Sequence, residues 1–134
     1  MGYESALHLI DVKIRKKALS RIEADITAGK EGKDPALGSF LEYAAIDIHG
    51  FLAFRAKGDG ADLYEPCEGE DAVPAMVGKW REAEAIARWI KTFSCKGGRI
   101  VLHSLEADGA AWGWEFDGKG RMRHLDLCAC GEWE

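Results

Sequence analysis

Four residues near the C-terminus combine three kinds of metal-ligating side chain. His124, Asp126, Cys128 and Cys130 are spaced by two along the chain. In an extended strand all four side chains would therefore project from one face, while the residues between them pack on the other. Imidazole, carboxylate and thiolate groups all bind transition metals, and a Cys-x-Cys pair can place both sulfurs on one ion. The spacing therefore offers a metal site as one hypothesis.

The same stretch also has an interpretation without a metal. Alternate side chains of a flat strand lie about 6 to 7 Å apart, too far for four ligands to converge unless the strand curls. A closed zinc site usually needs a second ligand pair, and Cys67, Cys95 and His103 are isolated in the sequence. Free cysteine often packs as a small hydrophobic residue. We therefore favour a strand without a metal and keep metal binding as the alternative.

Asp47 and His49 form a second spacing that could carry chemistry, at a predicted hairpin turn. An aspartate that orients a histidine is the supporting half of a general base. The sequence has no Gly-x-Ser-x-Gly elbow, and neither Ser39 nor Ser104 has a nucleophile motif around it. The glycine-rich stretches contain no Gly-x-x-x-x-Gly-Lys-Ser/Thr loop. We therefore expect neither catalysis nor a bound cofactor.

Basic side chains and tryptophans gather in the last predicted hairpin. Lys119, Arg121 and Arg123 follow shortly after Trp112 and Trp114. Basic groups beside exposed aromatic rings can hold single-stranded nucleic acid by stacking and phosphate contact. The two tryptophans alternate along a strand, which favours a place in the core, and the chain has a net charge of −5. Nucleic-acid binding is therefore a second alternative.

Nearly all the excess negative charge lies in the middle of the chain. Residues 34 to 78 carry two Lys or Arg against nine Asp or Glu, whereas the flanking parts have net charges of +2 and zero. Charge of one sign steers a partner of opposite charge. We therefore expect a small non-catalytic module that recognises another protein through residues 59 to 71, called the acidic segment below. Solubility alone would explain the same charges. The candidate partner-binding residues are Asp59, Asp62, Glu65, Glu68, Glu70 and Asp71.

Hydrophobic periodicity predicts the elements of the N-terminal half. Alternation from Ala6 to Ile14 predicts a strand. Apolar residues at helical spacing predict a helix after it, with Gly29 able to end the helix. Two apolar runs, Phe40 to Ile48 and Phe51 to Ala56, predict a hairpin whose turn is the intervening His-Gly pair.

The second half begins with the clearest predicted helix. Asp71 could cap it, Pro74 suits its first turn, and Gly97 with Gly98 would end it. The apolar stripe of this helix is Val77, Trp80, Ala83, Ala87, Ile90 and Phe93. Three strands follow, at Arg99 to Leu105, Ala111 to Phe116 and Met122 to Cys128. The pattern predicts an α+β fold in which a mainly antiparallel sheet of about five or six strands packs against two helices.

Size and composition complete the prediction. A chain of 134 residues with 47% hydrophobic residues fits a single domain spanning residues 1 to 134. No signal peptide and no membrane-spanning run is visible, so we expect a cytoplasmic protein whose four cysteines are reduced. A sheet edge could also pair two copies, which makes a homodimer possible.

Overall fold

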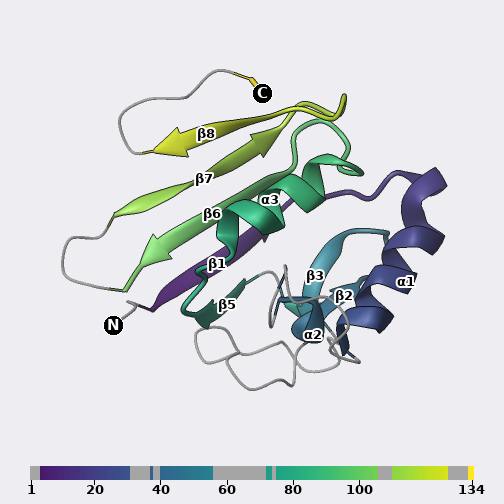
Figure 1. Ribbon diagram of the computed structural model, residues 1–134, viewed down its shortest axis with the longest axis horizontal. Coiled ribbons are helices and arrows are strands. Elements are labelled where there is room, and N and C mark those ends of the chain that lie inside the picture. The colour runs from purple at the N-terminus through teal and green to yellow at the C-terminus, as the bar shows by residue number, and fades with distance from the viewer. Residues whose placement is uncertain are drawn as a thin grey trace.

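The computed structural model describes residues 4–30, 37, 40–55, 72–73, 75–105, 110–126 and 133–134. It confirms the α+β fold class: a five-stranded antiparallel sheet is joined by a small sheet and covered by helices (Figure 1). The elements in chain order are β1 (Ser5–Ile10), the 3-10 turn η1 (Lys16–Ala18), α1 (Leu19–Lys30), α2 (Phe40–Tyr43), β2 (Ala44–Ile46), β3 (Leu52–Arg55), β4 (Ala72–Val73), β5 (Ala75–Gly78), α3 (Ala83–Lys91), β6 (Arg99–Ser104), β7 (Ala111–Phe116) and β8 (Met122–Asp126).

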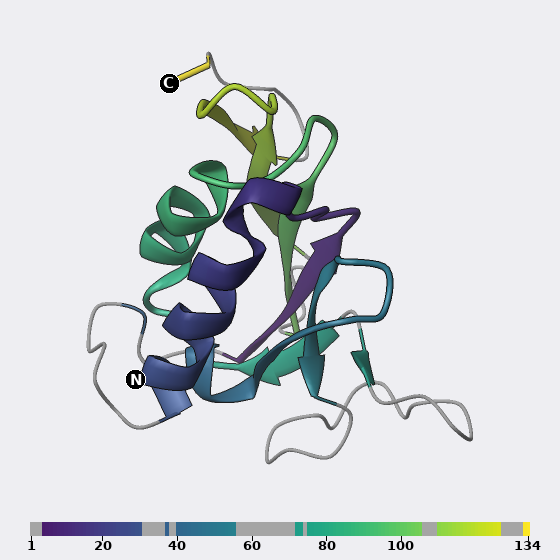
Figure 2. The ribbon, with the colours of Figure 1, turned by 90° about the vertical axis from the view of Figure 1, so that its right-hand side faces the viewer.

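The main sheet has the strand order β5-β1-β6-β7-β8, and every neighbouring pair is antiparallel. Helices α1 and α3 lie on the same side of this sheet, as the turned view shows (Figure 2). The register places the large buried side chains of the strands on that helix-covered face. These side chains are Leu7, Leu9, Ile100, Leu102, Trp114 and Phe116.

Aromatic side chains fill the centre of the core between the sheet and the helices. The Phe40 ring contacts Phe54, Trp80 and Trp89, with ring centroids 5.5, 6.1 and 6.0 Å apart. Edge-to-face pairs of this kind add to the stabilisation from burying apolar area. Because Phe40 is fully buried, truncating it to alanine would cost about 3 to 5 kcal/mol.

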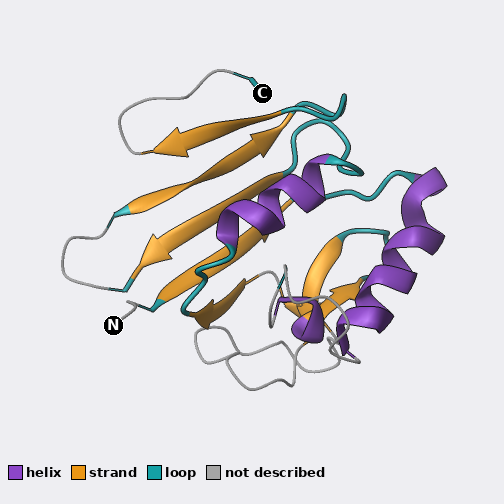
Figure 3. Cartoon of the chain, viewed as in Figure 1, coloured by secondary structure: helices purple, strands orange, loops and turns teal. Residues whose placement is uncertain are grey.

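A second sheet, with the order β2-β3-β4, is joined to the main sheet through the continuation of β1. The chain bends at Asp11, whose φ of 52° lies in the left-handed region. Beyond the bend, the Val12 carbonyl accepts a hydrogen bond from the Leu52 N–H at 2.9 Å, and the Ile14 N–H donates to the Gly50 carbonyl at 2.9 Å. The predicted strand from Ala6 to Ile14 is therefore confirmed as far as Ile10, after which the chain turns toward the small sheet (Figure 3).

The predicted strand from Phe40 to Ile48 is wrong in its first half. Helix α2 takes Phe40–Tyr43, and only Ala44–Ile46 form a strand. Phe40 and Leu41 are adjacent and both fully buried, whereas adjacent residues of a strand point to opposite faces. One helical turn directs both side chains into the same core. The predicted tight turn is confirmed, because Gly50 has a φ of 83°.

The second predicted helix is correct only in its middle, because α3 ends at Lys91, before the predicted end at Gly97 and Gly98. Helix α3 begins at Ala83, and Val77 lies in strand β5. The short segment before the helix pairs with β1 instead, with Met76 opposite Leu7 and Gly78 opposite Ser5. Glycine is a poor helix former, so sheet pairing prevails there. The proposed cap Asp71 and first-turn Pro74 lie outside the described residues.

Gly29 does not end α1, which continues to Lys30. A Cβ atom at Gly29 would lie 2.1 Å from the Cβ of Leu41, so the glycine is needed where α1 meets α2.

The last three strands follow the sequence pattern closely: β7 matches its predicted bounds, and β6 is one residue shorter than predicted. Strand β8 begins at Met122 as expected, and its predicted continuation to Cys128 lies outside the described residues.

Candidate functional site

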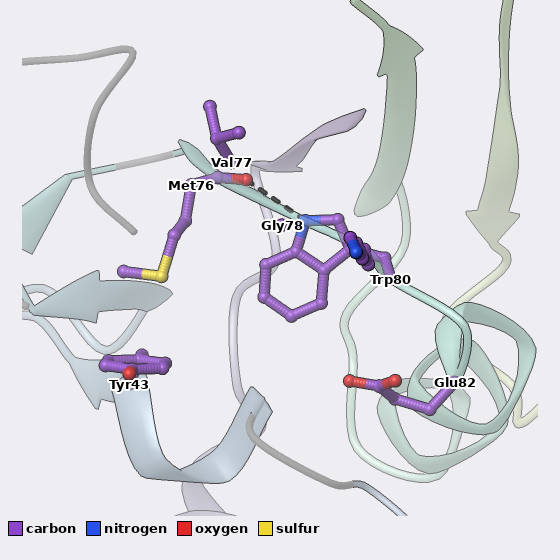
Figure 4. A pocket seen from close by; sticks show the side chains of 7 residues that line it. Tyr43, Met76, Val77, Gly78, Trp80 and Glu82 are labelled. Carbon is purple, nitrogen blue, oxygen red and sulfur yellow. Dashed lines mark hydrogen bonds between the residues drawn. The ribbon is translucent and has the colours of Figure 1, made fainter. Parts of the chain in front are cut away.

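A pocket of about 240 Å³ opens where strand β5 leads into helix α3, beside the end of α2 (Figure 4). Its volume is slightly below the range of about 300 to 1,000 Å³ typical of pockets for drug-sized ligands. A pocket of this size suits one side chain or one small organic group. The described residues that line it are Tyr43, Met76, Val77, Gly78, Lys79, Trp80 and Glu82.

The indole of Trp80 forms a fixed wall of this pocket. Its Nε1–H donates a hydrogen bond to the Met76 carbonyl at 3.1 Å. Its ring also packs against Phe54, with centroids 5.8 Å apart. A Cβ atom at Gly78 would approach Trp80 Cε2 to 3.2 Å, so the missing side chain at Gly78 lets the indole fold back along β5. The wall is therefore preorganised, and its polar N–H is already satisfied.

Glu82 supplies a carboxylate to the same pocket. It directly precedes α3, and its backbone carbonyl accepts the Ile86 N–H at 2.9 Å, as the first turn of a helix requires. Its side chain does not cap the helix. Figure 4 shows the carboxylate directed toward the side of the pocket where the indole lies. Among the described residues, this carboxylate has no hydrogen-bond or ion-pair partner, so it can accept from a bound group.

Tyr43, Met76 and Lys79 complete the described lining. Met76 is fully buried, Tyr43 is half-buried, and Lys79 is exposed. The Tyr43 ring and the Met76 thioether lie on the opposite side of the pocket from Glu82 (Figure 4). Aromatic rings present a negative π face, and a thioether is polarisable. Together with one carboxylate, these groups suit a positively charged guest.

The candidate metal ligands are only partly within the described residues. His124 is exposed, and its ring meets Trp114 edge-on with centroids 5.5 Å apart. Register places His124 and Asp126 on the same face of the sheet as Trp114, and both side chains are exposed while Leu125 between them is half-buried. The described residues contain no group of three His, Cys, Asp or Glu side chains that could hold a metal. Cys128 and Cys130 lie outside the described residues.

Asp47 organises the turn next to it. Its Oδ1 accepts the backbone N–H groups of His49 at 2.8 Å and of Phe51 at 2.9 Å. This is the short-range turn chemistry of aspartate, and the carboxylate is directed at the backbone of the turn. The His49 side chain is exposed. The pair therefore has a structural explanation in the turn itself.

The arginines of the last hairpin have acidic partners. Arg121 Nε lies 2.7 Å from Asp117 Oδ2, and Arg123 lies 2.6 Å from Glu115 and also stacks over Trp133. Desolvation acts to raise the pKa of Asp117, yet hydrogen bonds from the N–H groups of Lys119 and Arg121, and the Arg121 charge, lower it from 3.8 to about 2. Trp114, one of the two candidate stacking tryptophans, is buried.

Two histidines meet on the face of the main sheet that points away from α1 and α3. His8 on β1 and His103 on β6 come together because β1 pairs with β6. Burial lowers the pKa of His8 below 6.5, and the charge of His103 lowers it further. Sequence reasoning missed this pair because the two residues lie in distant segments.

Sequence reasoning also missed the pocket residues Tyr43, Trp80 and Glu82. The available signal was Gly78-x-Trp80-x-Glu82, in which a glycine and an acid flank a tryptophan at alternate positions. Assigning this stretch to a helix concealed it, because a helix would place Trp80 on the opposite side of its axis from Gly78 and Glu82. The acidic segment, which was the predicted partner site, lies outside the described residues.

No family model matches the chain, and no match is found among curated proteins or solved structures. None of the described helices is both long enough and apolar enough to span a membrane.

Proposed function

We propose that this protein is a small non-catalytic binding module that recognises a basic protein partner at the corner between β5 and α3. One observation carries the proposal: the pocket there combines a fixed aromatic wall with a carboxylate that has no partner among the described residues. Protein interfaces concentrate their binding energy in such preformed pockets, which receive an anchoring side chain from the partner.

The charge distribution supports a basic partner. The acidic segment carries six carboxylates, and its last residue, Asp71, directly precedes β4 and lies a few positions before Met76 in the pocket lining. Its negative charge would steer a basic protein toward this corner and raise the association rate. The pocket would then fix how the two proteins are positioned relative to each other.

A photo-crosslinking experiment tests whether the pocket is a contact surface. A photoreactive phenylalanine derivative replaces Lys79, in the pocket lining, or Lys119, an exposed lysine in the β7–β8 hairpin. After irradiation in cells, the captured protein is identified by mass spectrometry and produced in pure form. We expect the position 79 variant to capture one basic protein that the position 119 variant does not capture.

Binding to that purified partner then decides the proposal. Replacing Asp62, Glu65, Glu68 and Glu70 by their amides should slow association several-fold at low salt and leave the melting temperature unchanged, because charges that steer a partner act mainly on the association rate. Equal crosslinking at the two positions, or a captured protein whose binding does not respond to salt, would contradict the proposal.

A further inference from the structure

We propose that the pocket at the β5–α3 corner is a receptor for a guanidinium group, filled by one arginine side chain of the partner. This inference rests on the proposed function, because it names the chemical group that the partner inserts. It follows from three properties of the pocket: its counter-charge, the state of its indole and its size.

The counter-charge is the Glu82 carboxylate. Its position at the start of α3 fixes where the carboxylate leaves the backbone, and it points into the pocket (Figure 4). Among the described residues it has no competing partner. A carboxylate can accept two parallel N–H bonds from a guanidinium, and this fork geometry is specific to arginine. Glu82 would be the group that holds the charge of the guest.

The indole of Trp80 selects a cation over an anion. Its Nε1–H is already used by the Met76 carbonyl at 3.1 Å, so the ring has no free donor with which to bind an anion. What remains for a guest is the π system, which attracts cations and stacks against planar guanidinium groups. The Phe54 ring, 5.8 Å away, supports the indole from within the core and keeps its position fixed.

The size of the pocket limits the guest to a single side chain. A cavity of about 240 Å³ is smaller than the pockets of about 300 Å³ or more that enclose whole small molecules. Lys79 is the cation among the described lining residues, and its side chain is exposed. A lysine can extend its ammonium into water, so Lys79 weakens a cationic guest without excluding it.

An NMR titration of the intact protein tests the inference with three capped amino acids. The probes are the N-acetyl, N-methylamide forms of arginine, of its neutral isostere citrulline, and of lysine. The reporters are the Trp80 indole N–H and the Gly78 amide signals. We expect saturable shifts at these signals with the arginine probe, affinity at least about tenfold lower with citrulline, and weaker binding of lysine.

A matched pair of variants assigns the effect to Glu82. Glu82→Gln and Glu84→Gln remove the same charge at positions two residues apart, one just before α3 and one in its first turn, but the Glu84 side chain is 67% exposed and lies 3.9 Å from Arg88. We expect Glu82→Gln to weaken arginine binding at least about tenfold and Glu84→Gln to leave it within about twofold. Unchanged amide spectra away from the pocket would show that both variants are folded.

Equal shifts with arginine and citrulline, lysine binding as tight as arginine, or equal losses in the two variants would each overturn the guanidinium assignment. The crosslinking experiment tests the proposed function separately. If the photoreactive residue at position 79 captures a basic partner but the arginine probe leaves the pocket signals unchanged, the proposed binding module stands and the guanidinium receptor fails. If neither experiment succeeds, both proposals fail.

Discussion

The β7–β8 hairpin and the β5–α3 corner both carry acidic side chains, yet these side chains are in opposite situations. In the hairpin, Asp117 accepts two backbone N–H groups and an arginine, and Glu115 pairs with Arg123 at 2.6 Å. At the corner, the Glu82 carboxylate has no partner among the described residues. Acids of the first kind hold the fold together, whereas an acid of the second kind is available to a ligand.

The two regions also differ in how closely their glycines are packed against neighbouring atoms. A Cβ atom at Gly113 would lie 1.9 Å from the Ile100 carbonyl oxygen, which belongs to the backbone of a neighbouring strand. At Gly78 the nearest atom is Trp80 Cε2, in a side chain, at 3.2 Å. A side chain at position 113 would need the backbone of a paired strand to move, whereas one at position 78 would need the Trp80 side chain to give by only a few tenths of an ångström. Gly113 therefore tolerates a side chain less well than Gly78 does.

Gly113→Ala should give the largest effect and tests this contrast directly. We expect a loss of about 3 kcal/mol or more in the free energy of unfolding, because the added methyl group forces β6 and β7 apart. Urea denaturation measures the loss. Gly78→Ala is the matched control, and we expect it to cost about 1 kcal/mol or less because only the Trp80 side chain must move. Similar losses in the two variants would remove the distinction.

Asp117→Asn should have a smaller effect that depends on pH. Because the pKa of Asp117 falls from 3.8 to about 2 on folding, the folded protein holds this proton less tightly than the unfolded chain does. The stability that the anion contributes is therefore complete above about pH 4 and is lost as the pH falls toward 2. We expect the wild type to be more stable than Asp117→Asn at pH 6, with the difference disappearing near pH 2.

Denaturation curves of both proteins across this range provide the measurement, and the carboxyl carbon signal of Asp117 reports its pKa directly. An Asp117 pKa close to 3.8, or a stability difference that stays constant down to pH 2, would show that its contacts with Lys119 and Arg121 do not hold the hairpin in solution.

Lys79→Gln should give the smallest effect and sharpens the contrast from the pocket side. Removing the positive charge from the pocket lining should raise affinity for the arginine probe about twofold, because exposed charges interact weakly through water. The same NMR titration measures it, with Lys96→Gln, an exposed lysine after α3, as the control. Weaker binding after Lys79→Gln would mean that Lys79 helps to hold the guest. That result would contradict a cationic ligand.

The C-terminal strands were the most predictable part of the fold. Trp112, Trp114 and Phe116 alternate with smaller or charged residues, and β7 has the predicted bounds. The turn after β7 is also predictable, because Asp117 is followed by glycines at 118 and 120, whose φ values are 81° and 84°. In this region local preference and tertiary packing agree, so the sequence pattern is sufficient.

Elsewhere tertiary contacts override the local pattern, and the candidate pocket lies there. The stretch from Val77 to Trp80 continues the apolar stripe of α3 in the sequence, but pairing with β1 makes its first part a strand. Phe40 and Leu41 look like part of a strand, but a helical turn buries both. The pocket forms from these two misassigned segments, so its residues could not be grouped before the structure was known. The acidic segment stays a prediction.

The bend at Asp11 makes one continuous stretch of chain a member of both sheets. Before the bend, Leu7 is paired with Met76 on one side and Leu102 on the other; after it, Val12 bonds to Leu52. Neither sheet can open fully without releasing a strand that the other sheet also uses. We infer that the two sheets unfold as one cooperative unit, so that amide protons on either side of the bend become exchangeable in the same opening event.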